Sequence, residues 1–264
     1  MSWWGKLIGG TFGFMLGGPL GAILGAAFGH NFDTDNEPAP TPRQQTAQTD
    51  NVDAVQSAFF TATFAMMGHM AKADGLVTRA EIAVAEAVMR QMRLSPQQQQ
   101  LAMALFAQGK QPDFPVDDVL LQLRRECRNS GHLLQMFLEI QIATALADGN
   151  LDAAERRVLE RCAGSLGFSE FEYRLILQRL QASQHLHDGG PSQASKLRDA
   201  YHLLGVESNT DMETIKKAYR RLMNQHHPDK LVAKGLPQEM MDLASKKTME
   251  IKEAYELIKQ SREE

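Results

Sequence analysis

Cysteine is scarce in this sequence, and its placement excludes a common kind of zinc site. Only Cys127 and Cys162 occur among the 264 residues, and no C-x-x-C pair is present. Zinc sites built from cysteine repeats need such pairs, so they are excluded. Two distant thiols are typical of a protein in a reducing compartment, and we expect both to be buried and free.

Signals for catalysis and for nucleic-acid binding are also missing. The sequence contains no phosphate-binding loop and no pairing of a nucleophile with a base, so we expect no catalytic residues and no organic cofactor. The net charge of −4 argues against a nucleic-acid partner. No convincing alternation of apolar and polar residues indicates a strand. Hydrophobic residues make up 43% of the chain, which is enough for a sizeable core. We therefore predict an all-α fold.

Residues 52–183 carry apolar side chains at helical spacing throughout, which predicts one helical bundle. Caps mark two helix starts: Ser95 precedes Pro96 at the first helical position, and Ser169 with Glu172 forms a capping box. The predicted helices cover residues 55–72, 79–93, 96–108, 116–129, 132–147, 153–166 and 170–183.

The central bundle contains an internal repeat rich in acidic residues. An Ala-Asp-Gly run at residues 73–75 with Glu81 matches a second run at residues 147–149 with Glu155. Each carboxylate has a structural role available, because carboxylates cap helix starts and form Asx turns. They could instead converge on a hard divalent cation, although the spacing lacks a full EF-hand loop. The five candidate ligands are Asp74, Glu81, Asp148, Asp152 and Glu155.

The first 30 residues are expected to form a transmembrane helix that anchors the chain. No charged side chain occurs in residues 7–28, and this length of helix just crosses a bilayer. Trp3 and Trp4 stand at one end, where indole rings favour the membrane interface. Glycine recurs at every fourth position, which lets a second helix approach closely and predicts a homodimer. The glycines of this stripe are Gly9, Gly13, Gly17, Gly21 and Gly25.

Two polar segments are expected to be flexible linkers. Residues 31–51 are rich in Pro, Thr, Gln and Asp, and residues 184–195 contain two histidines, two glycines and a proline. The linkers separate the anchor (1–30), the central bundle (52–183) and a carboxyl-terminal region (196–264).

The carboxyl-terminal region predicts two antiparallel helices joined by a polar loop. We expect Thr210 and Glu213 to form a capping box at the start of the first helix. Apolar residues recur at helical spacing along it, and its cations lie on the other faces. Pro228 should end this helix at about residues 226–227 and leave His-Pro-Asp on an exposed turn. Residues 240–258 carry the second amphipathic run.

Four blocks of this region resemble the J domain of the DnaJ family, in the family's order and spacing. They are Tyr201-His-Leu-Leu-Gly205-Val, Ile215-Lys-Lys-Ala-Tyr219-Arg-Arg-Leu, His227-Pro-Asp-Lys230 and Ile251-Lys-Glu-Ala-Tyr255-Glu-Leu-Ile. The resemblance covers residues 196–264 and implies a helical hairpin that activates Hsp70, rather than an enzyme.

The resemblance also implies which residues act. In the family, the basic face of the helix that precedes His-Pro-Asp docks on an acidic surface of Hsp70, and His-Pro-Asp triggers ATP hydrolysis. Four cations within six residues suit this role, because they steer an acidic partner and add modest, salt-sensitive affinity. Tyr219 could instead pack its ring in the core, with only its hydroxyl available to a partner. The trigger is then His227, Pro228 and Asp229, and the docking face is Lys216, Lys217, Tyr219, Arg220 and Arg221.

The whole arrangement resembles the DjlA-type family of membrane-bound, DnaJ-like proteins of bacteria. The acidic repeat resembles the TerB-like domains of the tellurite-resistance family, and the run of residues 230–237 after His-Pro-Asp is also similar to DjlA-type proteins. The resemblance implies a single-pass protein of the inner membrane whose partner is the cytosolic Hsp70, DnaK.

The orientation in the membrane has arguments on both sides. Lys6 before the span and three carboxylates after it would, by the positive-inside rule, keep the amino terminus in the cytoplasm. A J domain needs cytosolic Hsp70, so we expect the opposite: a short tail in the periplasm and the bulk of the chain in the cytoplasm.

Three functions remain open at this point. The first is a membrane-anchored co-chaperone that stimulates ATP hydrolysis by DnaK, with the central domain recruiting an unidentified client or partner. The second is a TerB-type metal-binding or stress-responsive membrane protein, and the third is an oligomeric scaffold with an accessory J domain. A secretory signal peptide is the alternative to the anchor. No Gly/Phe-rich segment or usual client-binding module of the DnaJ family is present, so client binding falls to residues 52–183 or is absent.

Overall fold

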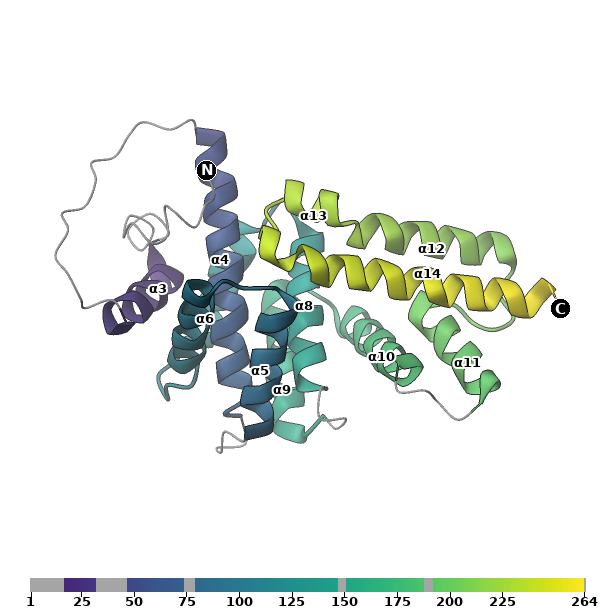
Figure 1. The fold of residues 1–264 in the computed structure, drawn as a ribbon, viewed down its shortest axis with the longest axis horizontal. Helices are drawn as coiled ribbons and strands as arrows, with labels where there is room; N and C mark the ends of the chain where they lie inside the picture. The colour runs from purple at the N-terminus through teal and green to yellow at the C-terminus, as the bar shows by residue number, and fades with distance from the viewer. Residues whose placement is uncertain (1–16, 32–46, 74–78, 147–150, 188–191, 264) are drawn as a thin grey trace.

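A computed structural model describes residues 17–31, 47–73, 79–146, 151–187 and 192–263 of the chain. Throughout these residues the secondary structure is helical, with turns and no strand (Figure 1). The all-α prediction is therefore confirmed.

The central bundle is built around α4, whose mostly apolar side chains are buried on every side of the helix from Val55 to Gly68. Phe59, Phe60 and Phe64 of this helix are completely buried, and α6, α7 and α8 pack against it. A helix that is apolar all round belongs in the middle of a bundle. The expected helices of this region are confirmed as α4 (Ala47–Met70), α5 (Arg79–Gln91), α6 (Pro96–Gly109), α7 (Val116–Glu126), α8 (Gly131–Ala145), α9 (Ala153–Leu166) and α10 (Glu170–His187). The first of them, α4, begins eight residues before its expected start at residue 55, so the end of the expected linker, residues 47–51, is helical.

Two glycines let α4 and α6 cross with their backbones in contact. A Cβ added to Gly68 would lie 2.0 Å from the carbonyl oxygen of Phe106, and one added to Gly109 would lie 1.8 Å from that of Ala65. Any larger residue at either position would push the helices apart, so this crossing depends on both glycines.

The described part of the expected anchor is α3 (Gly18–Asn31). It begins at Gly18 because Gly17 and Gly18 both have positive φ angles, 52° and 59°. Leu20 and Leu24 of α3 are buried in the core that α6 and α7 line. Of the glycine stripe, Gly21 and Gly25 lie on α3 and Gly17 precedes it, whereas Gly9 and Gly13 lie outside the described residues.

The carboxyl-terminal region forms a hairpin of long antiparallel helices that projects from one side of the bundle, as predicted (Figure 1). Its first and last helices, α11 and α14, pack together, and α12 packs on α14. The elements are α11 (Gln193–Leu204), α12 (Met212–His226), α13 (Pro228–Ala233), the 3-10 turn η1 (Gln238–Met240) and α14 (Met241–Glu263).

The segment expected to link the bundle to the hairpin is largely helical where it is described. Residues 184–187 form the last turn of α10, and α11 begins at Gln193. Ala182 and Leu186 of α10 pack against the core of the hairpin. The two regions are thus joined by a helix that contributes to both.

Candidate functional site

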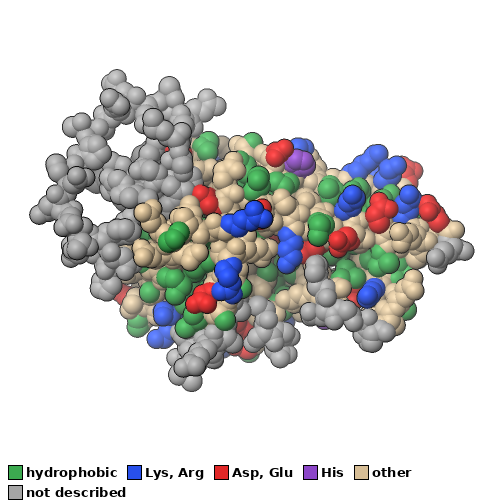
Figure 2. Space-filling model, viewed as in Figure 1, with side chains coloured by type: hydrophobic (Ala, Val, Ile, Leu, Met, Phe, Trp, Pro, Cys, Tyr) green, Lys and Arg blue, Asp and Glu red, His purple; other side chains and the backbone are tan. Residues whose placement is uncertain are grey.

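The cationic side chains of α12 lie on its solvent face. Lys216, Lys217, Arg220 and Arg221 are all exposed, while Ile215, Ala218 and Leu222 are buried in the hairpin. Lys217 pairs with Glu213 one turn earlier, with 2.8 Å between Nζ and Oε1. Figure 2 shows Lys and Arg side chains gathered over this end of the molecule, with Asp and Glu side chains among them.

The start of α12 differs from the prediction. Asp211 is the N-cap, and its carboxylate accepts a hydrogen bond of 2.9 Å from the backbone N–H of Thr214. Hydrogen bonds from Thr214 lower the pKa of Asp211. Thr210 accepts from the backbone N–H of Glu207 instead. The predicted box of Thr210 and Glu213 is wrong because a carboxylate, a strong hydrogen-bond acceptor, stands at the next residue.

The His-Pro-Asp motif lies where α12 ends and α13 begins. His227 is the single extended residue between the two helices, with φ −60° and ψ 122°, as expected for a residue before proline. Pro228 and Asp229 form the first turn of α13, so they belong to a helix rather than to the expected turn. His227 and Asp229 are exposed and Pro228 is half-buried. A partner can reach all three.

Tyr219 serves the core with its ring. It is half-buried, and its ring stacks on that of Tyr255 in α14, with centroids 4.4 Å apart and an interplanar angle of 19°. This stacking joins α12 to α14 directly beneath the cationic face.

The residue before the motif is buried against the central bundle. Only 3% of His226 is exposed, and its Nε2 lies 3.6 Å from Oε1 of Glu139 on α8. Gln135 donates a hydrogen bond of 2.7 Å to this carboxylate and accepts one from Gln225 of α12. Burial lowers the pKa of His226, against the opposing effect of Glu139, so the imidazole is neutral near pH 7.

The segment after the motif is buried in the same place. Leu231, Leu236 and Met240 are part of the core of the central bundle rather than of the hairpin. Gly235, with φ 105°, approaches α4 so closely that an added Cβ would lie 2.5 Å from Cγ1 of Val55. The motif is therefore held on both sides by the central bundle.

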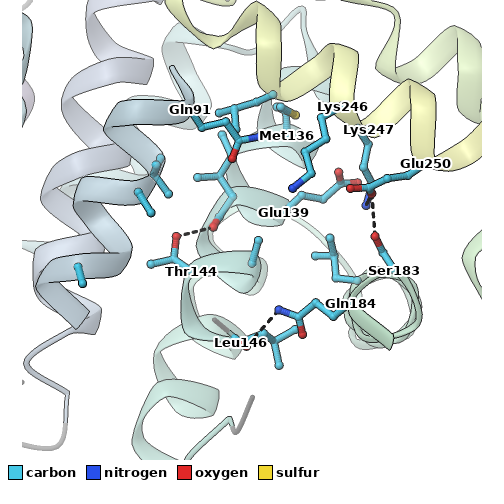
Figure 3. A pocket seen from close by; sticks show the side chains of 17 residues that line it. Gln91, Met136, Glu139, Thr144, Leu146, Ser183, Gln184, Lys246, Lys247 and Glu250 are labelled. Carbon is cyan, nitrogen blue, oxygen red and sulfur yellow. Dashed lines mark hydrogen bonds and ion pairs between the residues drawn. The ribbon is translucent and has the colours of Figure 1, made fainter. Parts of the chain in front are cut away.

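A cleft of about 620 Å³ opens beside Glu139, between α5, α8, α10 and α14 (Figure 3). Glu139 and Lys246 point into it from opposite sides, and its lining includes Val88, Ile140 and Leu180. The volume is in the range of small-molecule and peptide side-chain sites.

The acidic repeat does not form a metal site in the described residues. Asp152 is the N-cap of α9 and accepts from the backbone N–H groups of Ala154 and Glu155, while Glu155 accepts from that of Asp152. Within the described ranges, no group of three or more His, Cys, Asp or Glu side chains gathers in a way that could hold a metal. Asp74, Asp148 and the side chain of Glu81 lie outside the described residues, so the cation there stays a prediction.

Both cysteines are buried, as expected. Burial raises the pKa of Cys127 and of Cys162 to about 12, so neither is a thiolate at neutral pH. Neither is therefore a candidate nucleophile.

Three parts of the chain match known families. Residues 1–50 match the "Co-chaperone DjlA transmembrane domain", residues 60–178 match "Tellurite resistance protein TerB", and residues 199–264 match the "DnaJ domain". A protein of Shewanella oneidensis named "Co-chaperone protein DjlA" is 44% identical over 262 residues, which cover 99% of both chains. The chain belongs to the DjlA co-chaperone family.

Other DjlA relatives are similarly close. Those of Aliivibrio fischeri and Photorhabdus laumondii are 44% and 40% identical, each over 99% of both chains. No solved structure matches the chain. The name co-chaperone describes a regulator of another chaperone rather than a catalyst.

Membership in the DjlA family makes this a membrane-anchored protein, because the family's transmembrane domain covers its first 50 residues. In the part of the chain that the structure describes, none of the helices combines the length and the apolar character needed to cross a bilayer.

Sequence reasoning missed the residues of the central bundle that contact the residues next to the motif. Glu139 and Gln135 lie in the middle of a predicted helix and carry no local signal. Two features of the sequence around the motif could have indicated the contact. A second histidine, His226, directly precedes the motif, and residues 231–236 after it are mostly apolar, which is unusual for an exposed loop.

Proposed function

We propose that this DjlA-family protein docks the cationic face of α12 on an Hsp70 partner, DnaK in bacteria, and triggers that partner's ATP hydrolysis with His227, Pro228 and Asp229. The observation that carries the proposal is the placement of an exposed His-Pro-Asp motif at the end of an exposed cationic helix. An acidic surface would be attracted by the helix and would meet the motif in a fixed direction. The chain itself acts as an activator and carries out no catalysis.

The test is single-turnover ATP hydrolysis by a bacterial Hsp70, with the full chain in lipid nanodiscs. We expect His227→Gln to abolish the stimulation and Arg220→Ala with Arg221→Ala to raise the concentration needed for it at least tenfold. The double variant Arg156→Ala with Arg157→Ala is the control, because it removes the same charge from the exposed face of α9. Full stimulation by His227→Gln would reject the proposal.

We propose that the amino-terminal tail lies in the periplasm and the rest of the chain in the cytoplasm, and that the membrane helices of two chains pair through the glycine stripe. Support comes from the family match of residues 1–50 and from the regular glycine spacing. This pairing requires α3 to leave the core of the central bundle, in which its Leu20 and Leu24 are packed. Replacing Gly13, Gly17 and Gly21 by leucine should abolish self-association in a membrane reporter, and unchanged association would reject the dimer.

We propose further that the central domain recruits the client, and that the cleft beside α8 receives an apolar, unfolded segment. The apolar lining supports this choice, and the charged residues of the lining, Glu139, Glu250, Lys246 and Lys247, balance one another. Ala143→Trp would place an indole in the cleft and should weaken the binding of a fluorescent peptide of this kind at least fivefold. Ala107→Trp, on the exposed side of α6, is the matched control. Equal affinity in both variants would exclude the cleft.

A further inference from the structure

We propose that the central TerB-like domain positions the His-Pro-Asp motif, so that this J domain reaches full activity only while docked on α4 and α8. The inference rests on the proposed function and adds a role for Glu139, Gln135 and Val55, which touch the J domain from the central domain.

The first contact holds the motif from its amino-terminal side. Glu139 and Gln135 of α8 form a buried polar group with His226 and Gln225, the last two residues of α12. Buried polar side chains are costly to separate from their partners, so this contact fixes the end of α12 in direction as well as in place.

The second contact holds the motif from its carboxyl-terminal side. Leu231, only two residues after Asp229, is buried in the central core, and Leu236 follows it there. The close approach of Gly235 to Val55 brings the loop against α4, and the hydroxyl of Ser130 lies 3.4 Å from the backbone oxygen of Lys234. His227 therefore stands between two anchored points, five residues apart, at His226 and Leu231.

Further polar contacts lie at the edge of the interface between the central domain and the J domain, which we call the seam. Arg93, just after α5, lies 2.9 Å from Asp242 at the start of α14. Gln98 of α6 donates a hydrogen bond of 2.9 Å to Glu239 in η1. Together with the buried contacts, they distribute the docking over several helices of the central domain, which makes rotation of the J domain about a single contact unfavourable.

Docking leaves the functional surface open. His227 and Asp229 remain exposed while their neighbours on both sides are buried, and the four cations of α12 face solvent. The docked arrangement is thus suited to presenting the motif to Hsp70 rather than to hiding it. A loosened seam would let the motif change its direction relative to α12 while the docking face itself stayed intact.

The first experiment loosens the seam by Glu139→Ala in the full chain and measures Hsp70 stimulation over a range of concentrations. We expect the maximal stimulation to fall at least threefold, while the half-saturating concentration changes less than twofold, because the docking face is untouched. Glu139→Gln keeps the shape and the acceptor for Gln135 and should restore most of the stimulation. Glu160→Ala, an exposed carboxylate on α9, is the control for loss of charge. If Glu139→Ala equals the wild type, the positioning role is rejected.

The second experiment does not depend on a destabilising change. Arg93→Cys with Asp242→Cys places two thiols on opposite sides of the seam, and a short cross-linker with two maleimide groups, which add to thiols, should join them. Cys127 and Cys162 stay unmodified, because they are buried and their pKa of about 12 keeps them protonated. The joined protein should stimulate Hsp70 as well as the same protein before joining. If joining abolishes stimulation, and cutting a cleavable version of the cross-linker restores it, the domains must separate for activity and the inference is overturned.

The two proposals fail in different ways. If the wild-type chain does not stimulate Hsp70, the proposed function fails and the positioning role with it. If the wild type stimulates and His227→Gln does not, while both seam experiments contradict the expectations above, only the positioning role fails.

Discussion

The two ends of the J domain are stabilised in different ways. At the end far from the motif, Arg262 of α14 donates hydrogen bonds to the hydroxyl of Tyr201 and to the backbone oxygen of Ser208, so the hairpin closes on itself. At the motif end, Leu231 and Leu236 pack into the central bundle. The boundary that a family match draws in sequence is therefore not the boundary at which packing stops. The end that carries the trigger is the end that depends on another domain.

The largest expected effect comes from removing a core side chain at each end. Leu236→Ala and Ile258→Ala each empty a fully buried site, and each should cost about 2–5 kcal/mol of stability locally. Hydrogen exchange should separate them: Leu236→Ala should speed exchange in α4 and α8 as well as around the motif, because its cavity opens in the central core. Ile258→Ala should affect only α11, α12 and α14. Identical exchange patterns would mean that the two ends are not distinct.

A smaller effect should follow from pH at the motif end. Burial lowers the pKa of His226 below its ordinary 6.5, with Lys247, Arg179 and His132 acting in the same direction and Glu139 against them. The unfolded chain therefore binds this proton more readily, so docking is most stable above about pH 6.5 and weakens as the pH falls below it. His226→Phe should remove up to about 1.4 kcal/mol per pH unit of that dependence in urea unfolding. An unchanged slope would show that the imidazole is not neutral in the folded protein.

The smallest effect should separate the two roles of Tyr219. Tyr219→Phe keeps the ring stacked on Tyr255 and should leave thermal stability unchanged, while Tyr219→Ala should lose about 0.5–1.5 kcal/mol from the stacking alone. If the hydroxyl contributes to docking, Tyr219→Phe should still weaken Hsp70 binding about twofold. Calorimetric melting and a binding titration on the same samples give both answers. Loss of stability in Tyr219→Phe would contradict the packing role described for the ring.

Helices and their faces were predictable because they depend on local patterns. The apolar stripe of α12, its end at His226 and the cap at Ser95 follow from residues within a turn or two of one another. Where two neighbouring residues can both cap a helix, as Thr210 and Asp211 can, the local pattern does not decide between them, and the prediction of Thr210 was wrong.

The seam was not predictable for the opposite reason. Val55 and Gly235 are 180 positions apart, and nothing local in either marks the contact. Residues 184–195 have the composition of a linker, yet Leu186 packs against the hairpin because α10 continues past the point where its apolar pattern weakens. Contacts of this kind depend on how the helices pack in three dimensions, and the packing of distant helices cannot be predicted from local patterns in a single sequence.

Because residues of the J domain complete the core of the central bundle, this core stays incomplete for part of the time in which the chain is synthesised. The last helix of the bundle, α10, ends at His187, 53 residues before Met240, so at bacterial rates of synthesis the core lacks its final side chains for roughly 3–11 s. During that time an apolar surface stays open on a bundle that is otherwise complete. A chain that stops before Leu231 would keep this surface open permanently, so an interrupted copy of this co-chaperone would itself need chaperones.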